Sequence, residues 1–327
     1  MKITILSASP IDCQFENVIA SKPILNDNSD VVIVKSDDYF DDKLFEWLRR
    51  LKKKYLAVFV LGFNNPELIM YNKQYVDFCF DNNINFLDYD DQSGDLATYL
   101  EQNLSFTANY TKFAKYYLEL QPELDYDKWF RGIDFSDKSV VDLGCGMPTY
   151  LPRIMPREYL GLDLSIEMIN RAQVNFPNYQ FRAENITDAK FNCDVVISIL
   201  DVFNYLPSIE AVKEVITNCY NNLNSGGILI FDIHTKDVLR TFKDYFDFED
   251  TDDEQFIWES QVDNHKLTHY FQIIDKDYKV FVEKHYQTYY DVELLHKHLD
   301  RVGFTNISIE QHYNHHIITA YKKENDE

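Results

Sequence analysis

A short run near the middle of the chain constrains the fold more than any other feature. Two apolar residues, Val140 and Val141, lead into Asp142, and a Gly144-Cys145-Gly146 turn follows. This pattern predicts a buried strand, a glycine turn and then a helix, because glycine tolerates a positive φ and lets a ligand approach the backbone. In open parallel sheets such a turn lies at the carboxyl edge, where nucleotides bind. We therefore expect an α/β fold with a ligand site at this turn.

The segments on either side of this turn alternate between strands and helices, which predicts a mostly parallel sheet. The last two strands, close together in sequence, predict a closing antiparallel hairpin. The expected strands are 139–143, 159–163, 179–182, 193–200, 227–233, 306–311 and 315–322, and the expected helices are 165–174, 209–223 and 291–302.

Residues 255–290 break this alternation and predict an antiparallel insert. Its three expected strands are 255–262, 266–275 and 279–289, joined by turns rich in Asp and Asn. The acidic run 247–254, which precedes them, reads as a solvated loop rather than a metal cluster. The alternating strands and helices and the insert together form one expected domain, residues 105–327.

Residues 1–104 read as a separate small α/β domain. Short apolar strands at 2–7, 30–35, 56–61 and 84–88 alternate with helical stretches at 41–53 and 66–82. The region contains only Gly62 and Gly94, so it lacks a glycine-rich phosphate loop. We interpret it as a scaffold or docking domain, serving a protein partner or self-association.

Charge and cysteine content narrow the class of protein. The net charge of -22 repels phosphate backbones and anionic lipid, so we expect neither nucleic acid nor membrane as a partner. Five cysteines without metal-site spacing indicate reduced thiols. The N-terminal run 1–6 resembles a strand rather than a signal peptide, and no segment reaches the roughly 20 apolar residues of a membrane span. A cytoplasmic location is expected.

Three further acids stand where the next strands end. Asp163 follows the glycine turn by about twenty residues, a spacing that lets its carboxylate accept hydrogen bonds from ribose hydroxyls. Glu184 closes the third strand and could by the same logic meet an adenine edge. Asp201 closes the fourth, either as part of the site or as a strand-end cap.

These motifs resemble the class I methyltransferases that depend on S-adenosylmethionine (SAM). The likeness covers about residues 109–322 and rests on Asp142-Leu143-Gly144-Cys145-Gly146, Asp163, Glu184 and Asp201. A narrower likeness is to small bacterial methyltransferases with an antiparallel insert. It rests on Tyr126-Asp127-Lys128-Trp129 and Glu283-Lys284-His285-Tyr286-Gln287.

The resemblance implies a Rossmann-like sheet, SAM as cofactor and methyl transfer to an N, O or C atom of a small molecule. It implies acceptor-side roles for Tyr117 and Tyr205, and catalytic roles for Asp201, Glu283 and His285, although Glu283 and His285 also fit a polar edge strand. The cofactor contacts it implies are Tyr117, Asp142, Gly144, Gly146, Asp163, Leu164, Glu184, Asn185 and Asp201.

Other functions remain open at this point. The turn continues with Met147-Pro148-Thr149, where many such loops carry a third glycine. Pro148 has no N–H to offer a ligand, which leaves room for a non-catalytic binding protein of the same fold. A dinucleotide site would want glycine at Thr149, and an RNA methyltransferase is disfavoured by the charge.

All nine histidines follow residue 233, yet their spacing predicts no metal site. His296 and His298 fall on nearly opposite faces of a helix, and adjacent His315 and His316 on opposite faces of a strand. The pairs with HxxxH spacing, His265 with His269 and His312 with His316, lie in expected turns and strands rather than on a helix.

Overall fold

The computed structural model describes most of the chain from residue 125 onward and shorter parts before it. The described residues are 3–8, 16–19, 31–35, 44–54, 57–63, 84–89, 98, 104–106, 110, 113–116, 125–250, 254–275 and 280–324. The chain divides into two compact units. One comprises residues 1–106, 246–259 and 270–282, and the other comprises residues 107–245, 260–269 and 283–327.

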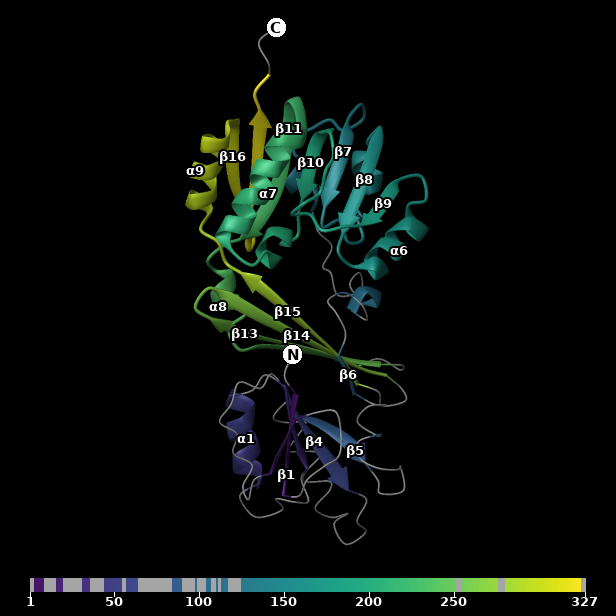
Figure 1. The fold of residues 1–327 in the computed structure, drawn as a ribbon, viewed down its shortest axis with the longest axis vertical. Coiled ribbons are helices and arrows are strands. Elements are labelled where there is room, and N and C mark those ends of the chain that lie inside the picture. Colours follow the sequence, from purple (N-terminus) through teal and green to yellow (C-terminus); the bar gives the residue numbers. More distant parts are fainter. Residues whose placement is uncertain are drawn as a thin grey trace. The chain divides into compact units, whose positions relative to one another are not determined.

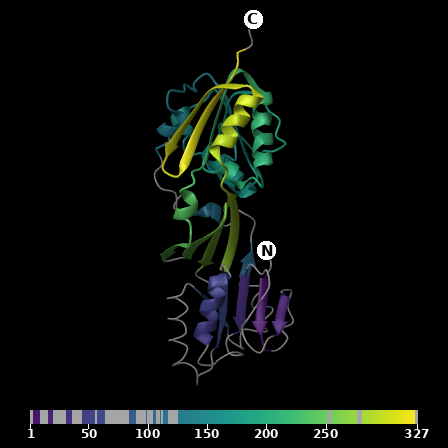
Figure 2. The ribbon, with the colours of Figure 1, turned by 90° about the vertical axis from the view of Figure 1, so that its left-hand side faces the viewer.

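The larger unit is built on a mostly parallel sheet (Figure 1). In the described residues this sheet has seven strands in the order β16-β17-β11-β10-β7-β8-β9. The five strands from β11 to β9 are parallel, and the β16–β17 hairpin closes the sheet in antiparallel fashion (Figure 2). The strands are β7 Ser139–Leu143, β8 Glu158–Asp163, β9 Gln180–Ala183, β10 Cys193–Ser198, β11 Leu223–His234, β16 Phe304–His312 and β17 His315–Lys322. The predicted α/β class with its terminal hairpin is confirmed.

Helices cover both faces of this sheet because its strands are apolar on both sides. Val141 and Leu143 pack in the core that includes residues of α7 and α9, whereas Val140 packs with Ile169 of α6 in a second core. Serine or aspartate side chains cap α6, α7 and α9 at their N-termini. The helices are α4 Asp127–Phe130, α5 Leu151–Ile154, α6 Ile166–Asn175, α7 Ile209–Asn222, α8 Val238–Thr241 and α9 Val292–Val302.

The strand order fixes where a ligand can bind. From β7 the chain continues outward to β8 and β9, and then returns to β10 on the other side of β7. Open α/β sheets hold ligands beyond the carboxyl ends of the two strands at such a reversal, which here are β7 and β10. The glycine turn follows β7, and Asp201 follows β10.

The antiparallel insert forms a second sheet in the order β12-β13-β14-β15-β6, and its strands are divided between the two units. Its strands are β12 Tyr245–Asp250, β13 Glu254–Asp263, β14 Lys266–Asp275, β15 Val280–Thr288 and β6 Leu104–Phe106. The prediction of a loop at 247–254 is wrong where β12 forms. Asp247, Glu249 and Asp250 are exposed on an edge strand, where charged side chains keep the edge from pairing with another chain.

The smaller unit holds the parallel sheet expected for the first hundred residues, in the order β2-β1-β3-β4-β5. Its strands are β1 Ile3–Ser7, β2 Glu16–Ile19, β3 Val31–Lys35, β4 Ala57–Phe63 and β5 Asn85–Tyr89, with α1 at Leu44–Lys54. The sequence pattern missed the four-residue β2. The helix expected at 66–82 lies outside the described residues. None of the helices in the described ranges has the length and apolar character needed to cross a bilayer.

Candidate active site

The two glycines of the turn after β7 differ in how closely neighbouring side chains pack against them. Gly144 and Gly146 both have positive φ, 72° and 48°. A Cβ atom added to Gly144 would lie 2.5 Å from Cγ1 of Val202, so only glycine fits there. A Cβ atom added to Gly146 would meet nothing nearer than Cε of Met168 at 3.8 Å. Gly146 is itself buried, and the Met168 side chain lies at an ordinary contact distance from this position.

Asp163, the predicted ribose-binding acid, lies at the end of β8 against this turn. Its Oδ2 accepts a hydrogen bond from the Gly146 N–H at 2.8 Å, and its Oδ1 accepts one from the Ser165 N–H at 2.8 Å. Burial raises the pKa of Asp163, and these backbone donors offset part of that rise. The carboxylate is thus fixed at the tip of β8, beside the backbone of Gly146.

Asp142 lies deeper than a ligand contact would. Only 1% of it is exposed, and its Oδ2 accepts hydrogen bonds from the hydroxyls of Tyr150 and Tyr159. Burial raises the pKa of Asp142 to about 7, although the two tyrosines lower it. In this structure the carboxylate anchors the turn to its surroundings.

The other expected cofactor contacts lie beyond β8 and β9. Glu184 is half-buried and forms an ion pair with Arg182, with 3.3 Å between Oε2 and Nη1. Asn185 accepts hydrogen bonds from the Thr187 N–H and hydroxyl, both at 3.0 Å. Leu164 is 75% exposed. Glu184 and Leu164 directly follow strands that end at the edge carrying Asp163.

A buried carboxylate that the sequence did not single out holds Asp201 in place. Asp232, fully buried on β11, accepts hydrogen bonds from the backbone N–H groups of Leu200 (2.9 Å) and Asp201 (2.8 Å), and from Nε1 of Trp129 (2.6 Å). Leu200 and Asp201 both adopt positive φ, 63° and 68°, a costly conformation for such residues. Asp232 stabilises this strained turn, and its position at the carboxyl end of β11 was the available signal.

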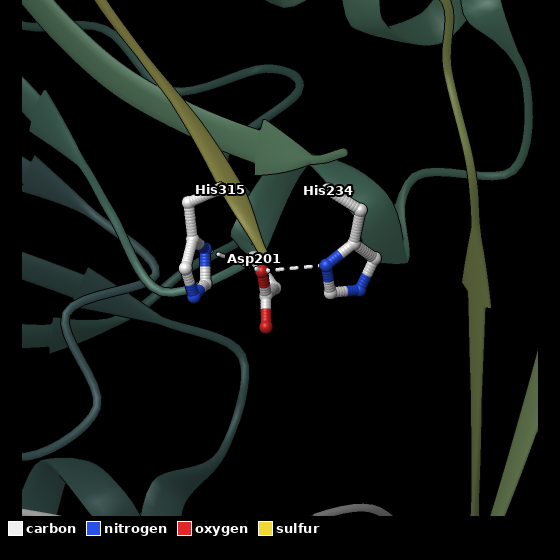
Figure 3. Close-up of side chains that lie close together, drawn as sticks. All are labelled: Asp201, His234 and His315. Atoms are coloured by element: carbon white, nitrogen blue, oxygen red, sulfur yellow. Dashed lines mark ion pairs between the residues drawn. The ribbon is translucent and has the colours of Figure 1, made fainter. Parts of the chain in front are cut away.

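Two histidines flank the Asp201 carboxylate (Figure 3). Its Oδ1 lies 3.0 Å from Nδ1 of His234 and 3.2 Å from Nδ1 of His315. Burial alone would raise the pKa of Asp201, but the two imidazoles outweigh it and hold that pKa below its usual range. Burial lowers the pKa of His315, but Asp201 outweighs this and raises it to about 9. We call these three residues the Asp201 cluster.

Glu283 and His285 belong to a hydrogen-bonded chain that ends in two tyrosines. Glu283 Oε2 lies 3.2 Å from His285 Nε2, His285 Nδ1 lies 3.1 Å from the Tyr205 hydroxyl, and that hydroxyl lies 2.7 Å from the Tyr110 hydroxyl. Burial lowers the pKa of His285 and raises the pKa of Tyr110 well above its usual range. We call this set the Glu283–Tyr110 chain.

Tyr110 connects this chain to the expected cofactor side. Its carbonyl oxygen accepts a hydrogen bond from the Ser165 hydroxyl at 3.0 Å, two residues after Asp163. Glu283 fixes the same segment by accepting hydrogen bonds from the N–H groups of Tyr110 (2.6 Å) and Phe113 (2.9 Å). The sequence predicted Tyr117 for a place between acceptor and cofactor. Tyr117 lies outside the described residues. Tyr110 is the described tyrosine that contacts both Tyr205 and Ser165.

Comparison with known proteins agrees with this geometry. Residues 134–285 match a family model described as a methyltransferase domain. The Bacillus subtilis (strain 168) protein YqeM, named provisionally as a methyltransferase, is 29% identical over 214 residues, which cover 60% of this chain and 86% of YqeM.

Two solved structures share the fold. One is a SAM-dependent methyltransferase from Clostridium acetobutylicum ATCC 824, with a TM-score of 0.56, 24% identity, and coverage of 65% of this chain and 99% of that one. The other is the sugar N-methyltransferase KedS8 from Streptoalloteichus sp ATCC 53650, with a TM-score of 0.50, 15% identity, and coverage of 66% and 89%. Residues 134–285 therefore match a methyltransferase domain, and the larger unit has the fold of solved SAM-dependent methyltransferases.

Proposed function

We propose that this enzyme transfers the methyl group of SAM to an N, O or C nucleophile of a small molecule. The observation that carries the proposal is the pairing of two neighbouring strand tips. Asp163 at the end of β8 accepts the N–H of Gly146 after β7 at 2.8 Å. A fixed carboxylate beside bare backbone suits a ribose with its two hydroxyls.

The cofactor side would be formed by the glycine turn and the ends of β8 and β9. Asp163 would bind the ribose, and Glu184 with Asn185 and Leu164 would border the adenine. Asp142 would act indirectly, because its carboxylate is already held by Tyr150 and Tyr159. Pro148 removes one backbone donor, a small loss for a cofactor that carries no pyrophosphate to bind.

The acceptor side would lie between the Asp201 cluster and the Glu283–Tyr110 chain. When bound, SAM supplies a methyl group already activated by its sulfonium, so the protein mainly aligns the nucleophile and excludes water. An acceptor that loses a proton on methylation would pass it towards Tyr110. His285 can take up such a proton because burial keeps its imidazole neutral and its Nδ1 faces the Tyr205 hydroxyl.

A small acceptor fits the charge of the molecule better than a nucleic acid does. The net charge of -22 repels phosphate backbones and attracts amines. The name of KedS8 says that it methylates nitrogen on a sugar, which makes amino sugars a natural first group of compounds to test.

The test is a transfer assay with SAM labelled on its methyl group. The full chain is incubated with panels of amino sugars, other amines and hydroxylated small molecules, and with total RNA in parallel. We expect label in a small-molecule product, and loss of that label in Asp163→Asn. Label in RNA alone would contradict the proposal that the acceptor is a small molecule. Failure of the chain to bind SAM would contradict the proposal that it is a SAM-dependent methyltransferase.

A further inference from the structure

The Asp201 cluster brings together three metal-ligating side chains from three separate elements. Asp201 follows β10, His234 ends β11 and His315 begins β17. Because β17 runs antiparallel to β11, its first residue pairs with the last residue of β11, so that His234 and His315 are register partners. One ligand atom from each residue lies within 4.8 Å of the others.

The three facing atoms are buried and lack hydrogen bonds. Oδ1 of Asp201, Nδ1 of His234 and Nδ1 of His315 are each shielded from solvent, and none of them makes a hydrogen bond of acceptable angle. Their separations from Oδ1, 3.0 and 3.2 Å, match neighbouring ligand atoms around one ion. Metal bonds of about 2.0–2.2 Å place adjacent ligand atoms roughly 3–3.5 Å apart.

The surroundings of His234 set which ring nitrogen carries the proton. Its Nε2 lies 2.8 Å from Oε1 of Gln287, and the same oxygen lies 3.0 Å from Nε2 of His269. Because an amide oxygen only accepts hydrogen bonds, Nε2 of His234 is the protonated nitrogen. In the neutral ring Nδ1 then directs a lone pair towards Asp201, and metal-binding histidines are held by such a partner on their other nitrogen.

Asp232 holds the backbone of the Asp201 cluster, and the three side chains differ in their exposure. Asp232 holds the backbone N–H of Asp201 at 2.8 Å, which fixes the direction of the carboxylate. The His234 side chain is 3% exposed, whereas those of His315 and Asp201 are 17% and 23% exposed. Three protein ligands leave the fourth position of a tetrahedral ion for water or for another ligand group.

We propose that Asp201, His234 and His315 bind one Zn²⁺ ion. Two imidazoles and one carboxylate suit Zn²⁺ better than Mg²⁺ or Ca²⁺, which prefer oxygen ligands alone. The proposal differs from the sequence-based expectation of no metal site. That expectation rested on the spacing of histidines along the chain, whereas His234 and His315 come together because β11 and β17 pair in register. The zinc proposal does not depend on the proposed methyl transfer, because a protein without transferase activity could still bind the ion.

The test measures zinc on the full chain after removal of any affinity tag. The protein is treated with a chelator, dialysed and titrated with ZnCl₂, and bound zinc is measured by mass spectrometry and calorimetry. We expect one ion per chain in the wild type. Asp201→Asn and His315→Gln should lose that ion, and Gln287→Met, which removes the partner of His234, should weaken binding by about 10- to 100-fold. His316→Gln is the matched control, because this histidine adjoins His315 and faces away from the cluster.

A spectroscopic measurement on the wild type keeps the proposal testable even if the variants fail to fold. Co²⁺ in place of Zn²⁺ should give visible d–d absorption typical of a low-coordinate nitrogen and oxygen site, and one equivalent of Zn²⁺ should abolish it. The absence of stoichiometric zinc and of this spectrum would overturn the proposal and leave the cluster as a buried ion pair. Zinc retained in both Asp201→Asn and His315→Gln would overturn it as well, since the ion would then lie elsewhere.

Discussion

At the scale of single residues, the two glycines of the turn do different work. Gly144 is required because Val202 fills the space where a side chain would stand, whereas a Cβ atom at Gly146 would be in ordinary contact with Met168, at 3.8 Å. Both have positive φ, which costs a non-glycine residue roughly 1–2 kcal/mol. A side chain at either glycine would therefore strain the backbone, but only a side chain at Gly144 would also collide with Val202.

Gly144→Ala is expected to destabilise the protein by more than Gly146→Ala does. Gly146→Ala should lose roughly 1–2 kcal/mol of unfolding free energy, from backbone strain alone. Gly144→Ala should lose at least about 2 kcal/mol more, because its methyl group would overlap Val202. Chemical denaturation of both variants checks this. Equal losses would show that the crowding at Gly144 has no energetic effect.

Asp142 should make stability depend on pH. Its folded pKa, raised from 3.8 to about 7, means that the folded state keeps the proton longer than the unfolded state does. The stabilisation is therefore full below pH 4 and is lost as pH rises towards 7, by on the order of 4 kcal/mol at most. Asp142→Asn, which cannot ionise, should flatten this decline.

Denaturation at pH 5 and pH 8 measures the effect. The wild type should lose more stability between these values than Asp142→Asn, and the exposed-site variant Asp300→Asn should behave like the wild type. Identical pH dependence in all three proteins would show that Asp142 ionises as freely when folded as when unfolded.

At the scale of elements, the strand-tip turn after β10 depends on residues from other parts of the fold. Trp129 of α4 donates to Asp232 of β11, and Asp232 in turn holds the N–H groups of Leu200 and Asp201. Trp129 of the Tyr-Asp-x-Trp motif is thus linked to the turn at Asp201 through the Asp232 carboxylate.

Trp129→Phe tests this connection while keeping an aromatic ring in the core. The loss of one short hydrogen bond to a buried carboxylate should cost about 1.5–3 kcal/mol of stability. Because the turn is strained, the variant should also lower the methyl-transfer rate more than it lowers SAM affinity. Thermal unfolding and steady-state kinetics give both values. Unchanged stability would contradict the role assigned to Asp232.

Most elements of the larger unit could be predicted from the sequence, because buried parallel strands and amphipathic helices leave periodic patterns. The sequence also predicted that Asp163 would meet the glycine turn, since neighbouring parallel strands end at one edge. The sequence pattern did not predict the edge strand β12, because its run of exposed acidic residues is also typical of a loop. It could not show the Asp201 cluster or Tyr110, because those contacts depend on register and on long connections.

At the scale of the whole molecule, the excess of negative charge should destabilise the folded state through self-repulsion. The net charge is -22 on 327 residues. Raising NaCl from about 0.01 M to about 0.1 M shortens the Debye length from roughly 30 Å to roughly 10 Å and screens that repulsion.

Salt should therefore raise the melting temperature, by a few degrees over this range. Differential scanning calorimetry at several NaCl concentrations, with the buffer held constant, checks the effect. A melting temperature that is constant or falls would show that paired charges outweigh the overall repulsion.

The central claim is that Asp163 and the glycine turn, at the carboxyl ends of β8 and β7, hold an adenosyl group, and calorimetry with S-adenosylhomocysteine tests it most directly. The account predicts one binding site per chain and an affinity at least about tenfold weaker in Asp163→Ala, because hydrogen bonds to a charged group are lost. Asp163→Asn should show the same direction and Asp300→Asn no change, with all three variants folded by circular dichroism. An unaltered affinity in Asp163→Ala, or no binding by the wild type, would contradict the account.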